Sequence, residues 1–382
     1  MKVLSRLLPV AAVAVVAATI AAPAASASTS ARHGSPGYPG GGAVFVQTDN
    51  TAGNAVVAYD RAADGTLTLA GTYPTGGLGG VLDGSVVDHL ASQGSLVYDR
   101  QHGLLYAVNA GSDTVSVFAV SGDRLALRQV VWSGGTFPVS VTVHGDYVYV
   151  LNALGSGSVY GYRVSGGQLS PIPGSSRSLN LTPVTGPNQY TNTPGQVAFT
   201  PDGSALIVTT KANGNDIDVF SVGWGGLLSA SPAVNSEPGA VPFAISYDRD
   251  GNVLIAEAGP DALATFALSG GVLTQLHIAD TGQTATCWVA RAGRYFYVSN
   301  AGSASVSGYA AGAGGSLTAL GNTTTGAGTV DASSAAHGHF LYVQTGGAGI
   351  VDEFAVSPGG SLTEIGSVTV AGAVGGEGIA AA

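Results

Sequence analysis

The sequence predicts an all-β fold, a seven-bladed β-propeller of four-stranded antiparallel blades whose ring is closed by the C-terminal strand. Three observations predict it. A strand–turn–strand pattern occurs seven times, further strand-like segments flank most copies, and the last strand-like segment of the chain supplies a strand that the first copy lacks. A four-stranded unit that recurs about every 40–60 residues is typical of a propeller blade.

The N-terminal segment does not share this pattern. Lys2 and Arg6 form a basic start, an Ala/Val-rich apolar stretch follows, and residues 25–27 read Ala-Ser-Ala, a small-residue cleavage site. We therefore predict a secretory signal peptide over residues 1–27 and a secreted, extracellular protein. The alternative, an uncleaved membrane anchor, is disfavoured because the apolar stretch is short for a membrane span.

The remaining chain divides at residue 42. Residues 28–42 are dense in Gly, Pro and Ser and have no apolar periodicity, so we expect a flexible leader before a propeller over residues 43–382. Removal of the signal peptide leaves 11 basic residues against 23 acidic ones, a net charge of −12. Such an acidic protein is poorly suited to nucleic acid or anionic membranes, and we expect neither as a partner.

The repeat is seen most clearly in residues 206–220, LIVTTKANGNDIDVF, where an apolar strand, a Gly/Asn-rich loop and an alternating strand follow one another. Six other stretches have this form: 44–60, 105–120, 148–164, 254–268, 296–310 and 341–356. The second strand of each copy has an aromatic residue near its end: Tyr59, Phe118, Tyr162, Phe220, Phe266, Tyr309 and Phe354.

Flanking segments complete the four-stranded unit. Most copies are preceded by a segment such as QVAFTPDGS and followed by one such as SGGVLTQLH. The first copy has no preceding strand, and we predict that residues 378–382 pair with it, since an open sheet edge invites aggregation. An open β-solenoid or a chain of β-sandwiches would leave this matching of strands unexplained.

The strand pair LYAVNAGSDTVSVFAV and the turn TPDGSALIV resemble the YVTN-type and lactonase-type seven-bladed propellers, which include enzymes similar to bacterial 6-phosphogluconolactonase and fungal carboxymuconate-lactonizing enzymes. The resemblance covers residues 43–382 and implies hydrolysis of a lactone or ester. Those enzymes carry histidine and arginine where the inner strands begin, whereas the matching positions here are Val139, Gln196, Phe243 and Cys287. This departure from the family pattern disfavours a phosphosugar substrate and leaves an unphosphorylated lactone or ester as the expected one.

The blade topology sorts the loops into two faces. The loops between second and third strands share one face, here called the top face, with the connections between blades, and the other turns lie on the bottom face. Two connections, 72–93 and 175–193, are long, and long loops on a rigid scaffold often carry binding residues. We therefore expect a site on the top face.

Candidate catalytic residues on this face are Lys211, Glu257 and His89. Opening a lactone ring needs a base to activate water and a donor for the oxyanion, so His89 or Glu257 is the candidate base and Lys211 stabilises charge. Candidate ligand-binding residues are Gln93, Gln196, Asn213, Asp331 and Glu377. No metal-site or nucleophile motif is present, and with Cys287 as the single cysteine there is no internal disulfide. We expect a monomer without metal or cofactor.

Three alternatives remain open at this point. The first is a non-catalytic extracellular propeller for a small polar ligand, a glycan or a protein, and the second is a structural repeat protein of the cell surface. The third concerns Lys211 and Glu257, which break the pattern of their loop positions: an ion pair between neighbouring blades would explain both without a ligand.

Overall fold

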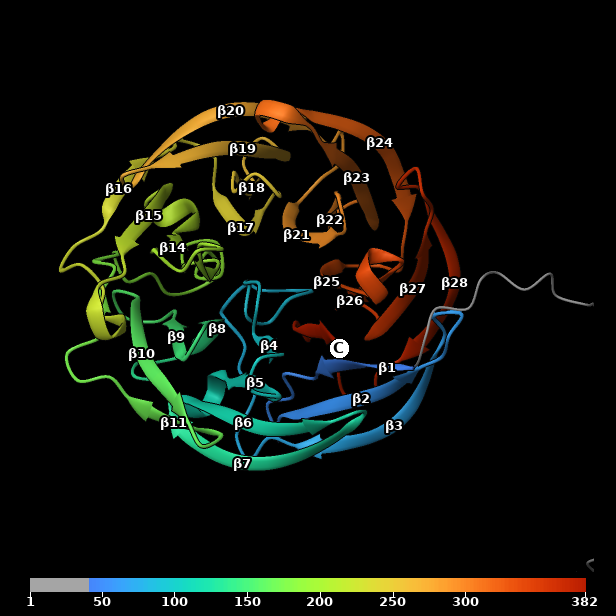
Figure 1. Cartoon of the computed structure of the whole chain (residues 1–382), viewed down its shortest axis with the longest axis horizontal. Helices are drawn as coiled ribbons and strands as arrows, with labels where there is room; N and C mark the ends of the chain where they lie inside the picture. The colour runs from blue at the N-terminus through green and yellow to red at the C-terminus, as the bar shows by residue number, and fades with distance from the viewer. Residues whose placement is uncertain (1–40) are drawn as a thin grey trace, which may run out of the picture. The chain divides into compact units, whose positions relative to one another are not determined.

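The computed structural model describes residues 41–382, which form seven antiparallel sheets arranged in a ring (Figure 1). The predicted signal peptide, and the leader up to residue 40, lie outside the described residues. Within each sheet the strands succeed one another from the centre of the ring to its rim and are named A to D here. The predicted seven-bladed propeller is confirmed.

The strands of each blade follow in the order A to D. Blade 1 has β29 (Ile379–Ala381), β1 (Gly42–Gln47), β2 (Ala55–Arg61) and β3 (Leu67–Pro74). Blade 2 has β4 (Leu96–Asp99), β5 (Leu104–Asn109), β6 (Thr114–Ser121) and β7 (Arg124–Trp132). Blade 3 has β8 (Pro138–His144), β9 (Tyr147–Asn152), β10 (Ser158–Ser165) and β11 (Gln168–Pro171), with the short β12 (Arg177–Ser178) beside β10. Blade 4 has β13 (Val197–Phe199), β14 (Ala205–Thr209), β15 (Asp216–Ser221) and β16 (Ala233–Ser236).

The remaining blades repeat this plan. Blade 5 has β17 (Pro242–Tyr247), β18 (Val253–Glu257), β19 (Ala262–Ser269) and β20 (Val272–Asp280). Blade 6 has β21 (Thr286–Ala292), β22 (Tyr295–Asn300), β23 (Ser305–Ala311) and β24 (Leu317–Thr324). Blade 7 has β25 (Thr329–Ala335), β26 (Phe340–Thr345), β27 (Ile350–Val356) and β28 (Leu362–Thr369). Single 3-10 turns occur at η1 (Ala110–Ser112), η2 (Lys211–Asn213), η3 (Trp224–Gly226), η4 (Ala313–Gly315) and η5 (Ala336–Gly338). None of the helices in residues 41–382 is long and apolar enough to cross a membrane.

The ring closes where the sequence predicts. β29 pairs antiparallel with β1, with Ile379 opposite Val46 and Ala381 opposite Val44. The strand itself is shorter than the predicted 378–382. Blade 1 is thus built from both ends of the described chain, which ties them together by backbone hydrogen bonds.

Burial follows the position of a strand in its blade. β5, β22 and β26 are buried along their whole length, because the flat face of each blade packs against a neighbour on either side. The D strands are instead mostly exposed, as in β20. The seven repeated aromatic residues of the C strands are all at most 2% exposed. Burial of one such side chain contributes roughly 1.5–3 kcal/mol, so these rings hold adjacent blades together.

Tyrosines of the B strands fix the spacing between blades. The hydroxyl of Tyr149 donates to the carbonyl of Gly226 in the next blade at 2.7 Å, and that of Tyr342 donates to Gly65 at 2.6 Å. Gly65 has φ +93°, and a Cβ there would lie 2.3 Å from the ring of Phe340. Glycine is therefore required in this turn between the C and D strands, both for its backbone conformation and for the close approach.

Candidate functional site

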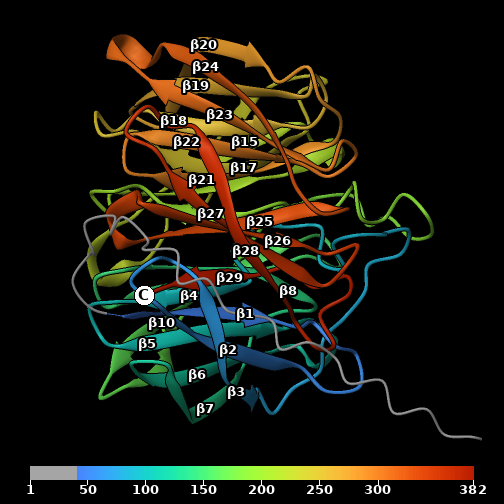
Figure 2. The same ribbon diagram turned by 90° about the vertical axis from the view of Figure 1, so that its right-hand side faces the viewer.

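The two long connections meet on the top face. Residues 75–95, between β3 and β4, are named the plug loop here, and residues 179–196 form the second loop, between β12 and β13. The Asp83 amide donates to the Gln189 side chain at 2.9 Å, and the Gly186 amide donates to the Asp83 carboxylate at 3.2 Å. Both loops project from the same face of the ring (Figure 2).

The plug loop enters the top end of the central channel. In Figure 1 its cyan trace runs into the middle of the ring. The hydroxyl of Ser92 donates to the carbonyl of Val139 in blade 3 at 2.8 Å, and the indole of Trp288 in blade 6 donates to the carbonyl of Ser92 at 2.7 Å. Ser92 is thereby held between blades 3 and 6, and the loop crosses the top end of the channel.

Bulges at the A strands shape the wall around this loop. The ladder between A and B strands is interrupted at the top of blades 3, 5, 6 and 7, at positions that include Val139, Phe243, Cys287 and Asp331. A bulge turns a side chain away from the regular alternation of the strand. Three of the four channel positions singled out in the sequence, all except Gln196, therefore coincide with local departures from strand geometry.

Lys211 opens η2 and is 1% exposed. Its ammonium donates to the carbonyls of Ala91 and Tyr190, each at 2.5 Å, and to the hydroxyl of Thr193 at 3.1 Å. It also lies 5.2 Å from the centre of the Phe243 ring. Burial lowers the pKa of Lys211 to about 7, although the charge of Asp88 acts in the opposite direction. Lys211 thus fastens the plug loop to the second loop.

Four acids that interact with one another are each at most 5% exposed, and the charge of one of them, Asp88, acts on Lys211: Asp49, Asp88, Asp331 and Glu377. The Asp88 carboxylate accepts from the amides of Leu90 at 2.8 Å and Ser92 at 2.9 Å. These bonds, made within one segment, give the plug loop its shape.

Glu377 joins the ring closure to the plug loop. Its carboxylate accepts from the Gly94 amide at 3.0 Å, and its own amide donates to Asp49 at 2.8 Å. The carboxyl groups of Asp331 and Glu377 share a hydrogen bond. Glu377 thus links the chain just before β29 to blades 1, 2 and 7.

Burial controls the protonation of these acids. It raises the pKa of Asp49 and of Asp331 to about 7 and that of Asp88 to about 6. The pKa of Glu377 is raised well above its usual range, first by burial and then by the charges of Asp331 and its other acidic neighbours. Two carboxyl groups in hydrogen-bond contact cannot both ionise easily, so this pair retains a proton near neutral pH.

The predicted glutamines and Asn213 act as internal braces. The amide of Gln93 makes two bonds to Val289 across the channel, at 2.9 and 3.0 Å, and the Gln196 side chain accepts from the Ile245 amide at 2.6 Å. Asn213 donates to the carbonyls of two second-loop residues at 2.7 and 2.8 Å. These side-chain amides are therefore engaged in hydrogen bonds to other residues of the protein.

Among the described residues, the other two predicted catalytic residues make no hydrogen bond to the ammonium of Lys211. His89, on the plug loop, is half-buried against Gly375, and burial lowers the pKa of its imidazole. Glu257 ends β18, and burial, followed by the charge of Glu237, raises its pKa to about 7. Within residues 41–382 no hydrogen bond or ion pair joins Glu257 to Lys211, so the interblade pair considered from the sequence is not formed.

Sequence reasoning missed Asp49 and Asp88. Asp49 comes two residues after the end of its B strand, the place that Lys211 takes in blade 4 and glycine takes in blades 2, 5, 6 and 7. This repeat position holds an acid in blade 1 and a base in blade 4, where four other blades have glycine. That difference between the repeats was the signal that could have identified Asp49. Asp88 carried no comparable signal, because its loop has no counterpart in other blades.

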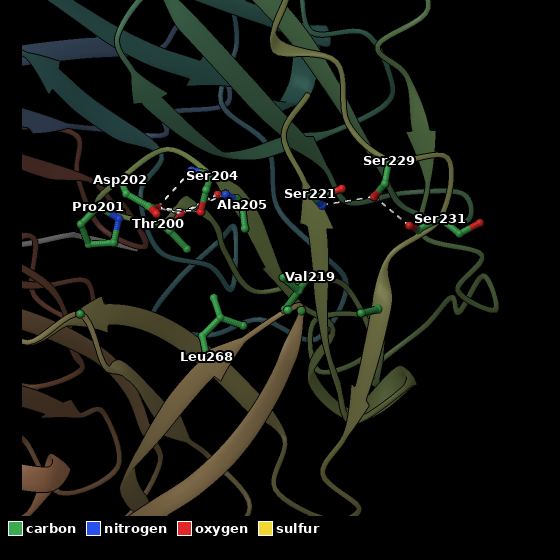
Figure 3. Close-up of a pocket in the computed structure, with 14 residues that line it drawn as sticks. Thr200, Pro201, Asp202, Ser204, Ala205, Val219, Ser221, Ser229, Ser231 and Leu268 are labelled. Carbon is green, nitrogen blue, oxygen red and sulfur yellow. Dashed lines mark hydrogen bonds between the residues drawn. The ribbon is translucent and has the colours of Figure 1, made fainter. Parts of the chain in front are cut away.

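Cavities also open on the bottom face. One, of about 590 Å³, lies between blades 4 and 5 (Figure 3). Its hydroxyls hold turns: Thr200 donates to Asp202 at 2.7 Å, Ser204 donates to Asp202 at 2.9 Å, and Ser229 donates to the Ser231 carbonyl at 2.9 Å. A second, of about 760 Å³, lies at the bottom end of the central channel. By contrast, the pocket beside Asn213 on the top face measures about 170 Å³.

Comparison with known proteins places this architecture among solved structures. No family model and no curated protein sequence matches the chain. The periplasmic gluconolactonase of Pseudomonas aeruginosa is 20% identical, with a TM-score of 0.71 over 90% of this chain and 99% of that one. Candidate 6-phosphogluconolactonases from Bacteroides uniformis and Bacteroides fragilis are 18% and 19% identical, with TM-scores of 0.71 and 0.68, over 90% of this chain and 99% and 98% of theirs. Over nine-tenths of its length, the chain has the fold of the lactonase-type seven-bladed propellers.

Proposed function

We propose that this chain is an exported propeller that binds a small polar ligand without hydrolysing it. The observation that carries the proposal is the position of Lys211, whose ammonium is enclosed by three oxygen atoms of the protein itself. An oxyanion donor must reach the reacting carbonyl, and a base must reach water. Lys211 is engaged in structural hydrogen bonds, and Asp49, Asp88, Asp331 and Glu377 are buried away from solvent.

The free-energy cost of displacing the plug loop supports a function without hydrolysis at the top of the channel. A ligand at the top of the channel would have to displace the plug loop from Val139, Trp288, Lys211 and Glu377. A neutral hydrogen bond contributes roughly 0.5–1.5 kcal/mol and a charged one about 1.5–3 kcal/mol. Breaking all four hydrogen bonds at once costs more free energy than a small polar molecule readily offsets. Export is proposed from the signal-like residues 1–27 alone.

The direct test is turnover by the purified mature protein with an unphosphorylated sugar lactone, glucono-δ-lactone, followed by acid release at constant pH. We expect the rate of the buffer alone. A rate above the buffer that Asp331→Asn abolishes, and that Asp202→Asn in an exposed bottom turn leaves intact, would overturn the proposal.

One observation favours a second function, hydrolysis of an unphosphorylated lactone or ester. The Asp331–Glu377 pair holds a proton near neutral pH, as a general acid–base group does. This function requires the plug loop to leave the channel. The same turnover measurement separates the two functions.

A further inference from the structure

The bottom end of the central channel is a cavity of about 760 Å³ with a basic wall. This site, named the bottom mouth here, is lined by Arg61, Arg100, Arg291 and His337, with Ser334 and Ala382 among the remaining residues. The arginines come from the ends of β2, β4 and β21 in blades 1, 2 and 6. Strands of three different blades thus bring three guanidinium groups to one cavity in a protein with an acidic net charge.

Arg61 is the most constrained of the three. It is 4% exposed, and its Nε has no hydrogen-bond partner although the atom is buried. The remaining interactions of its guanidinium are weak, a bond of 3.4 Å from Nη1 to the carbonyl of Ala62 and the Phe340 ring at 5.6 Å. A buried N–H group without a partner is unfavourable, so the Arg61 guanidinium retains a donor that the protein does not use.

Arg100 and Arg291 are held by carbonyl groups and aromatic rings. Arg100 donates to the carbonyl of Ala381 at 2.8 Å and lies over the Tyr98 ring at 5.4 Å. Arg291 donates to Gly293 at 2.8 Å and to Tyr247 at 2.9 Å. Each guanidinium carries five N–H groups, so these bonds orient both side chains and leave donors free.

In the part of the chain that the structure describes, no ion pair joins an arginine of the bottom mouth to an Asp or Glu side chain. The ion pairs formed there involve His102, Arg163 and Arg249, and none involves Arg61, Arg100 or Arg291. Gathered like charges repel, and an oxyanion between them removes that repulsion. The planar fork of arginine matches the two oxygens of a carboxylate or a phosphate.

We propose that the bottom mouth binds a small oxyanion, a carboxylate or a phosphate ester, between Arg61, Arg100 and Arg291. This rests on the proposed function, for which it names the ligand class and a site on the face opposite the plug loop. The volume of about 760 Å³ accommodates a ligand of sugar-acid size.

The experiment is isothermal titration of the mature protein with three probes at equal ionic strength: inorganic phosphate, citrate and uncharged glucose. We expect saturable binding of phosphate or citrate and none of glucose, and the tighter of the two anions identifies the chemistry of the ligand. The double variant Arg100→Gln/Arg291→Gln should weaken that binding at least tenfold. The matched control Arg163→Gln/Arg249→Gln removes two arginines that are exposed and lie outside the bottom mouth, and should leave it unchanged.

Arg61 is not substituted in this test. Because its side chain is buried, a substitution there would reduce binding through a folding defect as well as through the loss of a ligand contact. Absence of binding by both anions, or an equal loss in the control variant, would overturn the inference. Lactone turnover would contradict the proposed function, but the anion titration would still decide whether the bottom mouth binds an oxyanion. Absence of both turnover and anion binding would refute this inference alone.

Discussion

The Asp331–Glu377 pair makes a quantitative prediction about stability and pH. Burial raises the pKa of Asp331 from its ordinary value of 3.8 to about 7. An acid whose pKa is higher in the folded state binds more protons there than in the unfolded chain. Its stabilising contribution is therefore complete below about pH 4 and is lost as the pH rises through about 7.

The size of the effect follows from the shift. Each pH unit well below the folded-state pKa removes about 1.4 kcal/mol for one extra proton, and the loss is smaller near pH 7, so one independent group loses about 2 kcal/mol between pH 5 and 7. Asp331→Asn keeps an acceptor for the Ala332 amide, which lies 2.8 Å from the carboxylate, and a donor for Glu377. The substitution therefore removes the ionisable group at position 331 with little change in the shape of the side chain.

The assay is urea unfolding of the wild type and Asp331→Asn at several pH values from 5 to 7. As the pH rises, the free energy of unfolding should fall more steeply for the wild type than for the variant. The difference between the two slopes should correspond to about one bound proton. Asp202→Asn, in an exposed bottom turn, is the control and should follow the wild type. Parallel profiles for the wild type and Asp331→Asn would refute the assignment of a shared proton to this pair.

Three further predictions concern the packing. Lys211→Met should lower the free energy of unfolding by about 2–4 kcal/mol, because it leaves two buried carbonyls without a donor, whereas Arg249→Met at the surface should change it by less than about 0.5 kcal/mol. Phe266→Ala should cost about 3–5 kcal/mol in the same urea assay, and Trp224→Ala, at a residue 97% exposed, almost nothing. Removal of residues 378–382 should open the ring. In thermal unfolding it should lower the midpoint and replace one cooperative transition by a broad one. A sharp transition at the original temperature would contradict the role of β29.

The fold was predictable because its signals are local and repeated. The C-strand aromatics, such as Phe118 and Phe266, recur once per blade, and each is buried as the pattern indicates. Ring closure followed from a missing strand in the first copy and a spare one near Ile379. Neither inference depends on how loops fold.

The candidate site was harder to predict, since loop conformation decides it. The sequence places Lys211 on the top face, and the structure turns its ammonium inward to Ala91, a residue 120 positions away in a loop without internal repeats. Asp331 and Glu377 were predicted as ligand groups on their own, but the hydrogen bond between them depends on a bulge and on the closing strand. The bottom mouth joins Arg61 and Arg291 from blades distant in sequence, and no motif connects them.

The central claim is that the plug loop closes the top of the channel. Amide hydrogen exchange of the mature protein at neutral pH tests it most directly, read at the amides of Leu90, Ser92 and Gly94, which donate to Asp88 and Glu377. We predict protection comparable to that of the buried strand β5. Exchange as fast as that of an exposed turn would show an open channel and contradict the account.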